Sequence, residues 1–233
     1  MRLVVPSWLV PGGWLENVEV AAGLGWASGI ELLFFSFEGE DRELFLSERD
    51  RIINAAARGG LSLSVHLPDP LLPAHCELVE LLAPAAECFV VHPPRRDEAD
   101  AWRSLLSILR KRHGDRFLLE YTGAEAFASA EETLPGLPLC ADTGRLLVEG
   151  MDPASWIAQR VERIREVHLH GAEAAGEAAG DTVSPRDHRV FSGREPWLSA
   201  LRPFLSDWAG RIELEVFSLA KVEAARTALK ELA

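Results

Sequence analysis

Residues 61–67, with the sequence LSLSVHL, include an apolar stretch that leads into a histidine, His66. Five further apolar stretches of the chain also lead into side chains that can bind a metal. In chain order, these terminal residues are His66, His92, Glu120, Asp142, the pair His168 and His170, and Glu215. If each stretch forms a strand, most of its side chains are buried, and the last side chain points out of the end of the strand. Six such ends in succession predict strands that converge on one metal site.

The chain between and around these ends alternates between strand and helix patterns. Strands are expected at residues 2–8, 29–35, 61–67, 88–92, 116–121, 137–142, 165–170 and 211–217. Helices are expected at residues 17–25, 47–57, 75–86, 97–113, 124–133, 152–163, 195–208 and 219–232. Strands that alternate with helices in this way indicate a parallel sheet, because each crossover is helical. We therefore predict an α/β fold, a (β/α)8 TIM barrel, with residues 1–233 as a single domain.

In a TIM barrel, the carboxyl ends of the strands open into one shared mouth, which would bring the terminal residues together. A mixed set of imidazoles and carboxylates suits Zn²⁺, Mn²⁺, Fe²⁺ or Co²⁺ better than Mg²⁺ or Ca²⁺, and this set is large enough for one to three ions. A single histidine at a strand end is more often a hydrogen-bonded structural residue than a ligand. Four of the seven histidines occupy such ends, however, which favours a metal site. Ions in such a site can lower the pKa of a water molecule and clamp a phosphate ester.

The segment 171–193 follows the seventh expected strand and is rich in Ala, Gly and charged residues. It is much longer than the usual connection in a barrel, and long loops in compact domains tend to act as lids or binding segments. Its Asp187 and His188 are further candidate ligands. Trp8 and Trp14, which follow the first strand, are candidates to line the mouth.

The formal net charge of −12 bears on the choice of partner. It repels a phosphate backbone and anionic lipids, so we expect a small-molecule substrate and neither nucleic acid nor a membrane. No stretch approaches the roughly 18 apolar residues of a membrane span, and the N-terminus has no signal-peptide layout. The three cysteines show no CxxC spacing, which indicates a reducing compartment, the cytoplasm.

In this order, the strand ends resemble the pattern of the xylose isomerase-like superfamily, which includes the endonuclease-IV-type enzymes. The strings that carry the resemblance are SVHLP at 64–68, VVHP at 90–93, LLE at 118–120, ADTG at 141–144, VHLHG at 167–171, Asp187-His188 and LEVF at 214–217. The resemblance implies metal-ligand roles for His66, His92, Glu120, Asp142, His168, Asp187, His188 and Glu215. The chain departs from the pattern at Arg145, where the superfamily has a histidine. A guanidinium cannot bind a metal, but it can hold a phosphate oxygen.

Within that superfamily, the string IELLF at 30–34 and the strings around His66, His168 and Glu215 resemble the cobamide-remodelling phosphodiesterases. This resemblance implies a metal-dependent hydrolase that cuts the phosphodiester in the nucleotide loop of a cobamide, with catalytic roles for Glu120, Arg145 and His170. Two alternatives remain. One is a divalent-metal-dependent sugar or sugar phosphate isomerase or epimerase, in which Glu120 and Glu215 move a proton between carbons. The other is a non-catalytic barrel that binds a corrinoid or a sugar.

Overall fold

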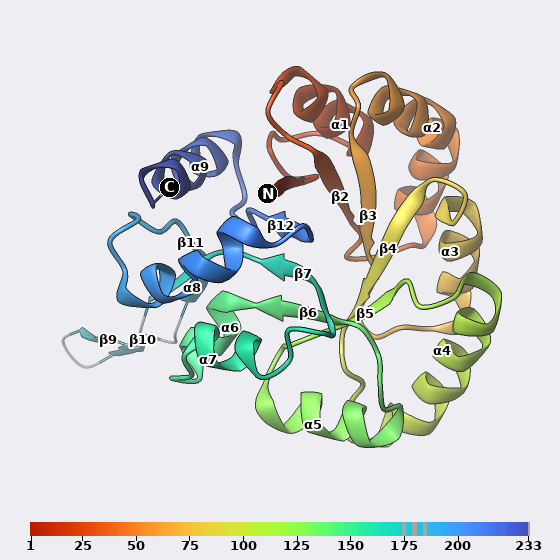
Figure 1. The fold of residues 1–233 in the computed structure, drawn as a ribbon. Coiled ribbons are helices and arrows are strands. Elements are labelled where there is room, and N and C mark those ends of the chain that lie inside the picture. Colours follow the sequence, from red (N-terminus) through yellow and green to blue (C-terminus); the bar gives the residue numbers. More distant parts are fainter. Residues whose placement is uncertain (174–175, 179–180, 184–185, 233) are drawn as a thin grey trace.

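Eight parallel strands close into a barrel in the computed structural model, which describes residues 1–173, 176–178, 181–183 and 186–232 (Figure 1). The barrel strands are β1 (Arg2–Pro6), β2 (Gly29–Leu33), β3 (Ser62–His66), β4 (Ala86–Val91), β5 (Phe117–Glu120), β6 (Leu139–Asp142), β7 (Ile164–His168) and β12 (Arg211–Glu213). Consecutive barrel strands are neighbours, and β12 closes the ring by pairing with β1, with Ile212 opposite Leu3. The predicted (β/α)8 barrel is confirmed.

Helices surround the barrel and separate its consecutive strands (Figure 1). They are α1 (Trp14–Gly23), α2 (Gly39–Arg58), α3 (Cys76–Leu82), α4 (Ala99–His113), α5 (Ala124–Thr133), α6 (Thr143–Val148), α7 (Pro153–Ala158), α8 (Pro196–Asp207) and α9 (Leu219–Leu232), with short 3-10 turns at Pro73–His75 and Arg96–Glu98. Local sequence sets some of their ends. The Asp152 side chain caps α7 by accepting a hydrogen bond from the Ser155 amide at 3.0 Å. Among the described residues, no helix is both long and apolar enough to cross a membrane.

Apolar side chains pack on both faces of the barrel strands, in one layer on each face. Along β4, Phe89 belongs to the large core beneath the helices, whereas Cys88 and Val90 belong to a small separate cluster on the other strand face. Buried charge adjoins this cluster near the amino ends of the strands. There the Arg211 guanidinium donates to Glu166 Oε1 at 3.1 Å and to Ser64 Oγ at 2.6 Å. This end of the barrel is therefore closed by structural contacts, which leaves the carboxyl end for chemistry.

The helix after β6 differs from the sequence expectation. Of the expected helix at 152–163, only α7 (Pro153–Ala158) forms. The sequence did not predict α6, which begins directly after Asp142. The cause is local, because the Asp142 carboxylate accepts a hydrogen bond from the Arg145 amide at 2.8 Å and so caps α6. Asp142 therefore ends a strand and starts a helix in one residue, which fixes its carboxylate at the barrel mouth.

The segment after β7 also differs, because the expected loop at 171–193 contains short strands. Its β8 (Gly171–Glu173) pairs with β11 (Arg186–Arg189), and β9 (Gly176–Ala178) pairs with β10 (Asp181–Val183), both antiparallel. The first pair lies against α6. It brings Asp187 and His188, which belong to β11, to the barrel mouth.

Candidate metal centre

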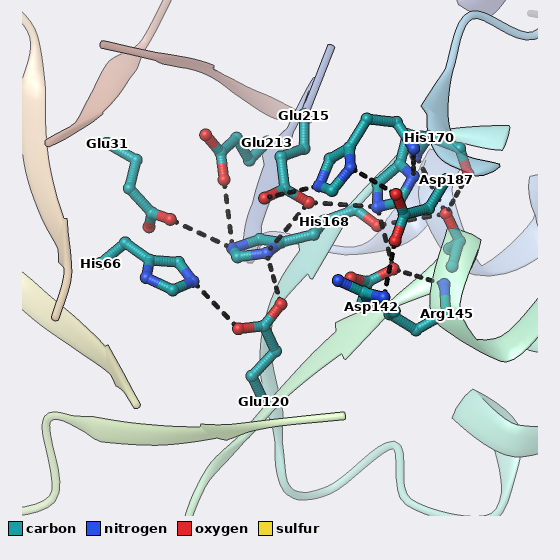
Figure 2. Close-up of polar contacts among 12 residues, drawn as sticks. Glu31, His66, Glu120, Asp142, Arg145, His168, His170, Asp187, Glu213 and Glu215 are labelled. Carbon is teal, nitrogen blue, oxygen red and sulfur yellow. Dashed lines mark hydrogen bonds and ion pairs between the residues drawn. The ribbon is translucent and has the colours of Figure 1, made fainter. Parts of the chain in front are cut away.

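The strand ends meet around a cavity of about 210 Å³ at the carboxyl end of the barrel. Its polar lining consists of His66, Asp69, His92, Glu120, Thr122, Asp142, Arg145, His188 and Glu215. Figure 2 shows how side chains from separate strands point toward one another around Glu120 and Glu215. The structure therefore brings the sequence-predicted site residues together, and their distances decide which chemistry each one can support.

Two histidines face one carboxylate oxygen of Glu120. This glutamate is buried, with 3% of its surface exposed. His66 Nε2 lies 3.0 Å and His92 Nε2 lies 2.9 Å from Glu120 Oε2. On its other side, His92 Nδ1 lies 3.2 Å from Asp69 Oδ2. Burial lowers the pKa of His92, but the charges and hydrogen bonds of Glu120 and Asp69 outweigh burial and raise it to about 10. Without a metal, this imidazole is therefore protonated at neutral pH.

A second pair of histidines faces Glu215. His170 Nε2 lies 3.1 Å from Glu215 Oε2 and 2.9 Å from Asp142 Oδ1, and His188 Nε2 lies 3.4 Å from Glu215 Oε1. The two imidazoles stack with ring centroids 4.5 Å apart. Backbone strain accompanies this placement, because His188 has a φ of 52°, in the left-handed region that few non-glycine residues adopt.

His170 is buried and contacts two carboxylates. The backbone N–H of His188 donates to His170 Nδ1 at 2.8 Å, and His170 Nε2 faces Asp142 and Glu215. His170 is 0% exposed and does not line the cavity. It also belongs to a group of close donor atoms with His188 and Glu215, and its predicted catalytic role stays a prediction.

A central set of donors lies between these two pairs and consists of Glu120, Asp142, His168 and Glu215. His168 Nδ1 lies 3.2 Å from Glu120 Oε1 and 3.5 Å from Glu215 Oε2. With zinc–ligand bonds of 2.0–2.2 Å, donor atoms around a tetrahedral ion lie about 3.4 Å apart. The donor types and spacing of this set therefore fit a divalent metal, and the pairs at Glu120 and Glu215 add further donors.

Two buried glutamates that the sequence analysis did not assign to the site lie behind His168. His168 Nε2 is 3.3 Å from Glu31 Oε1 and 3.1 Å from Glu213 Oε2, and all three side chains are 0% exposed. Within the described part of the chain, no hydrogen bond of good geometry reaches the oxygens of either glutamate. His168 Nε2 also has no hydrogen bond of good geometry among the described residues. A proton on Nε2, close to these carboxylates, would leave the Nδ1 lone pair free for a metal, the usual arrangement behind a histidine ligand.

Glu213→Gln is expected to weaken zinc binding by about 10- to 100-fold, because the amide no longer fixes the proton on His168 Nε2. Glutamine is nearly the same size as glutamate, so the substitution leaves the packing around this buried position intact. The thermal midpoint of the metal-free protein should therefore not fall. Competition with a chromophoric chelator and thermal unfolding in a chelator measure the two effects. Unchanged zinc affinity, equal to that of an exposed control, Glu43→Gln, would contradict this role.

Arg145 and Asp187 lie at the rim of the cavity and pair with each other. Arg145 Nη1 is 2.9 Å from Asp187 Oδ2, and Asp187 Oδ1 is 2.8 Å from His188 Nδ1. Among the described residues, Asp187 belongs to none of the metal-donor groups, and its ligand role stays a prediction. Its contact with Nδ1 orients the ring of His188. The Arg145 side chain keeps 44% of its surface exposed at the cavity, where an anion can reach it.

No family model and no protein of curated function matches this sequence. Solved structures match over the whole chain. IolI with a bound zinc atom superposes with a TM-score of 0.70 at 14% identity, covering 100% of this chain and 98% of IolI. The TTHB071 protein from Thermus thermophilus, from a crystal soaked with ZnCl2, gives 0.59 at 25% identity, covering 100% and 97%.

A third similar structure is a sugar phosphate isomerase/epimerase from Parabacteroides distasonis, with a TM-score of 0.61 at 13% identity. The match covers 100% of this chain and 96% of that protein. These likenesses show that the fold is a TIM barrel, as the closed ring of eight parallel strands does. Zinc is named with two of the three structures, which agrees with the donor sets described above.

Proposed function

We propose that this chain is a divalent-metal-dependent enzyme that hydrolyses a phosphodiester. One observation carries the proposal: Glu120 and Glu215 each belong to the central donor set and also to a flanking set with two histidines. Neighbouring ions would therefore share a carboxylate. Sites with two or more closely spaced ions are typical of phosphatases and nucleases, where they stabilise the attacking and leaving oxygens of an in-line displacement.

Ions held here would supply Lewis acidity toward the phosphoryl oxygens and lower the pKa of a water molecule. The residues of the chain fix the geometry. Glu120 and Glu215 would hold neighbouring ions, His170 and His188 would complete the set at Glu215, and Arg145 would donate N–H groups to phosphate oxygens. The nucleotide loop of a cobamide stays the substrate that the sequence resemblance predicts, and none of the three named structures is described as a phosphodiesterase.

Arg145→Ala is expected to raise KM for a phosphodiester by about 10- to 100-fold, since a hydrogen bond to a charged group contributes roughly 1.5–3 kcal/mol. The value of kcat should change by only a few-fold, because a guanidinium cannot bind a metal and Arg145 would contact only the phosphate. Arg145→Lys should recover part of the loss. Steady-state kinetics on the metal-loaded protein measure these effects, and an unchanged KM would exclude substrate contact by Arg145.

A second candidate is a sugar or sugar phosphate isomerase or epimerase, and the name of the Parabacteroides distasonis structure favours it over hydrolysis. The central donor set alone suffices for one ion. Glu120 and Glu215 approach His168 Nδ1 together, so one of them could remove a proton from a substrate carbon. In this reading, the histidine pairs at Glu120 and Glu215 would be positioning residues and no second ion would be needed.

Product analysis separates the two reactions. The zinc- or manganese-loaded protein is incubated with bis-p-nitrophenyl phosphate, with adenosylcobalamin, and with a panel of sugars and sugar phosphates in D₂O. Release of nitrophenol or of a nucleoside from the cobamide supports hydrolysis. Deuterium incorporation at a sugar carbon, without phosphate ester cleavage, supports the isomerase and rejects our proposal. A metal-loaded protein that does neither, yet binds a corrinoid or a sugar, supports the non-catalytic barrel.

A further inference from the structure

A row of aromatic rings leads from the candidate metal centre to the outer rim of the barrel. It begins at His188, whose ring centroid lies 4.7 Å from that of Phe217. Phe217 lies 5.7 Å from Trp8, and Trp8 lies 4.8 Å from Phe35. The residues come from four parts of the chain: β11, the segment after β12, the segment after β1 and the segment after β2. The fold therefore assembles the row at the carboxyl end of the barrel.

The outer end of this row borders a second cavity of about 330 Å³. Leu33 and Phe35 line both this cavity and the one at the metal centre, so the two cavities are adjacent. The remaining lining residues are Ser7, Trp8, Gly12, Gly13, Trp14, Ser36, Asp41 and Leu44. The expectation that Trp8 and Trp14 line the mouth thus holds for an adjoining cavity and not for the metal pocket itself. A volume in this range suits a ring system of a small molecule.

The wall behind this cavity is rigid, whereas its rim is open. Trp14 stacks on the buried Phe34 with ring centroids 4.8 Å apart and donates its indole N–H to the Leu33 carbonyl at 2.9 Å. In contrast, Phe35 is 67% exposed and Trp8 is 46% exposed. Large exposed rings beside a preformed concave wall are typical of a ligand-binding surface and not of packing.

We infer that this second cavity binds a flat aromatic ring that belongs to the same substrate molecule as the group that reacts at the metal centre. The rings of Trp8 and Phe35 supply stacking surface, which strengthens binding by about 5- to 150-fold per stacked ring in comparable sites. The Ser36 hydroxyl donates to the exposed Asp41 carboxylate, which in turn can accept from an N–H or O–H group on the ring edge. The substrate class is therefore a phosphate ester with an attached aromatic ring.

This inference rests on the proposed function only for the phosphate part of the substrate. The test uses binding, which does not require turnover. The probes are 2-naphthyl phosphate, methyl phosphate and 2-naphthol, measured on the zinc-loaded protein by calorimetry or by ligand-observed NMR. The variants are Trp8→Ala and Phe35→Ala, with Ile108→Ala as the control, because Ile108 is an exposed apolar residue on α4 outside both cavities.

We expect the parent protein to bind 2-naphthyl phosphate at least about tenfold tighter than methyl phosphate. Trp8→Ala and Phe35→Ala should each weaken the naphthyl probes by about fivefold or more and leave methyl phosphate unchanged, and Ile108→Ala should change neither. If 2-naphthol binding depends on Trp8 but no phosphate probe binds, the ring site stands and the proposed function fails.

Two results would overturn the inference. One is equal affinity for the naphthyl and methyl probes, or naphthyl affinity that Trp8→Ala and Phe35→Ala leave unchanged. The other is a parent protein that light scattering shows to be a dimer and that Trp8→Ala converts to a monomer. That result would mean that a second copy of the chain, and not a ring of the substrate, covers Trp8 and Phe35. Thermal unfolding of the variants confirms that each one is folded.

Discussion

Glu120→Gln is expected to lower kcat of the metal-loaded enzyme by about 10³-fold or more while the barrel still folds. Glu120 Oε2 faces His66 and His92, and Glu120 Oε1 faces His168, so this carboxylate joins the central donor set to a flanking one. The amide is a weak neutral ligand and also places an N–H group among the imidazoles. Loss of a single preorganised charged group in an active site typically costs 10²–10³-fold, and Glu120 serves two donor sets.

The measurement combines steady-state turnover with zinc stoichiometry by mass spectrometry, because the second readout does not depend on the reaction. Glu120→Gln should bind fewer zinc equivalents than the parent. Glu43→Gln, an exposed carboxylate on α2, is the matched control and should behave as the parent does. Full activity and full zinc content in Glu120→Gln, with an unchanged circular dichroism spectrum, would contradict the metal centre described here.

Zinc uptake is expected to release protons and to become about tenfold tighter per pH unit between pH 6.5 and 8.5 for an ion that His92 holds. The carboxylates of Glu120 and Asp69 raise the pKa of His92 to about 10 against the effect of burial, so this imidazole carries a proton throughout that range. A ligand histidine must be neutral, so the metal displaces the proton. Without metal, Glu120 and Asp69 therefore stabilise His92 as a cation, and with metal Glu120 would bind the same ion as His92.

The thermal stability of the metal-free protein and that of the zinc-bound protein should consequently change in opposite directions as the pH rises. A group whose pKa is raised on folding contributes stability below its unfolded value of 6.5, and this contribution is lost as the pH rises toward 10. The metal-free protein should thus lose thermal stability above pH 6.5, whereas the zinc-bound protein should gain it. Calorimetry in two buffers of different ionisation enthalpy counts the released protons. A His92→Gln variant should release about one proton fewer, and His113→Gln, outside the cavity, should not; equal release by both would disprove the assignment.

The strand ends could be predicted from the sequence because the signal is local. An apolar stretch followed by His66, Glu120 or Asp142 identifies both the strand and the direction of its last side chain, and the parallel barrel then brings the ends together. The alternation of strands and helices was sufficient for the fold for the same reason. Each βα unit is a local pattern, and closure follows from the number of units.

The second layer of the site depends on strand pairing and could not be predicted in this way. Glu31 lies within a fully buried strand, and Glu213 is the last residue of another. Only the register of β12 against β7, with Glu213 opposite His168, shows that Glu213 supports the ligand. A charged residue inside a buried strand was the available signal, because such a group needs a partner.

The position of His170 also depends on contacts that the local sequence does not contain. Its position two residues after His168 predicted a side chain on the same face at the mouth, but β7 ends at His168. The amide of His188 then turns the His170 ring behind Asp142 and Glu215. The hairpin of β8 and β11 causes this contact, and its pairing brings together residues that lie far apart in the sequence.

Anomalous diffraction from a zinc-soaked crystal tests the central claim most directly. We predict an anomalous peak within about 2.0–2.3 Å of donor atoms from Glu120, Asp142, His168 and Glu215, and a second peak beside His66 and His92. The first peak alone would support a single-ion enzyme and favour the isomerase. Zinc bound only at the surface, with no peak inside the cavity, would contradict the account.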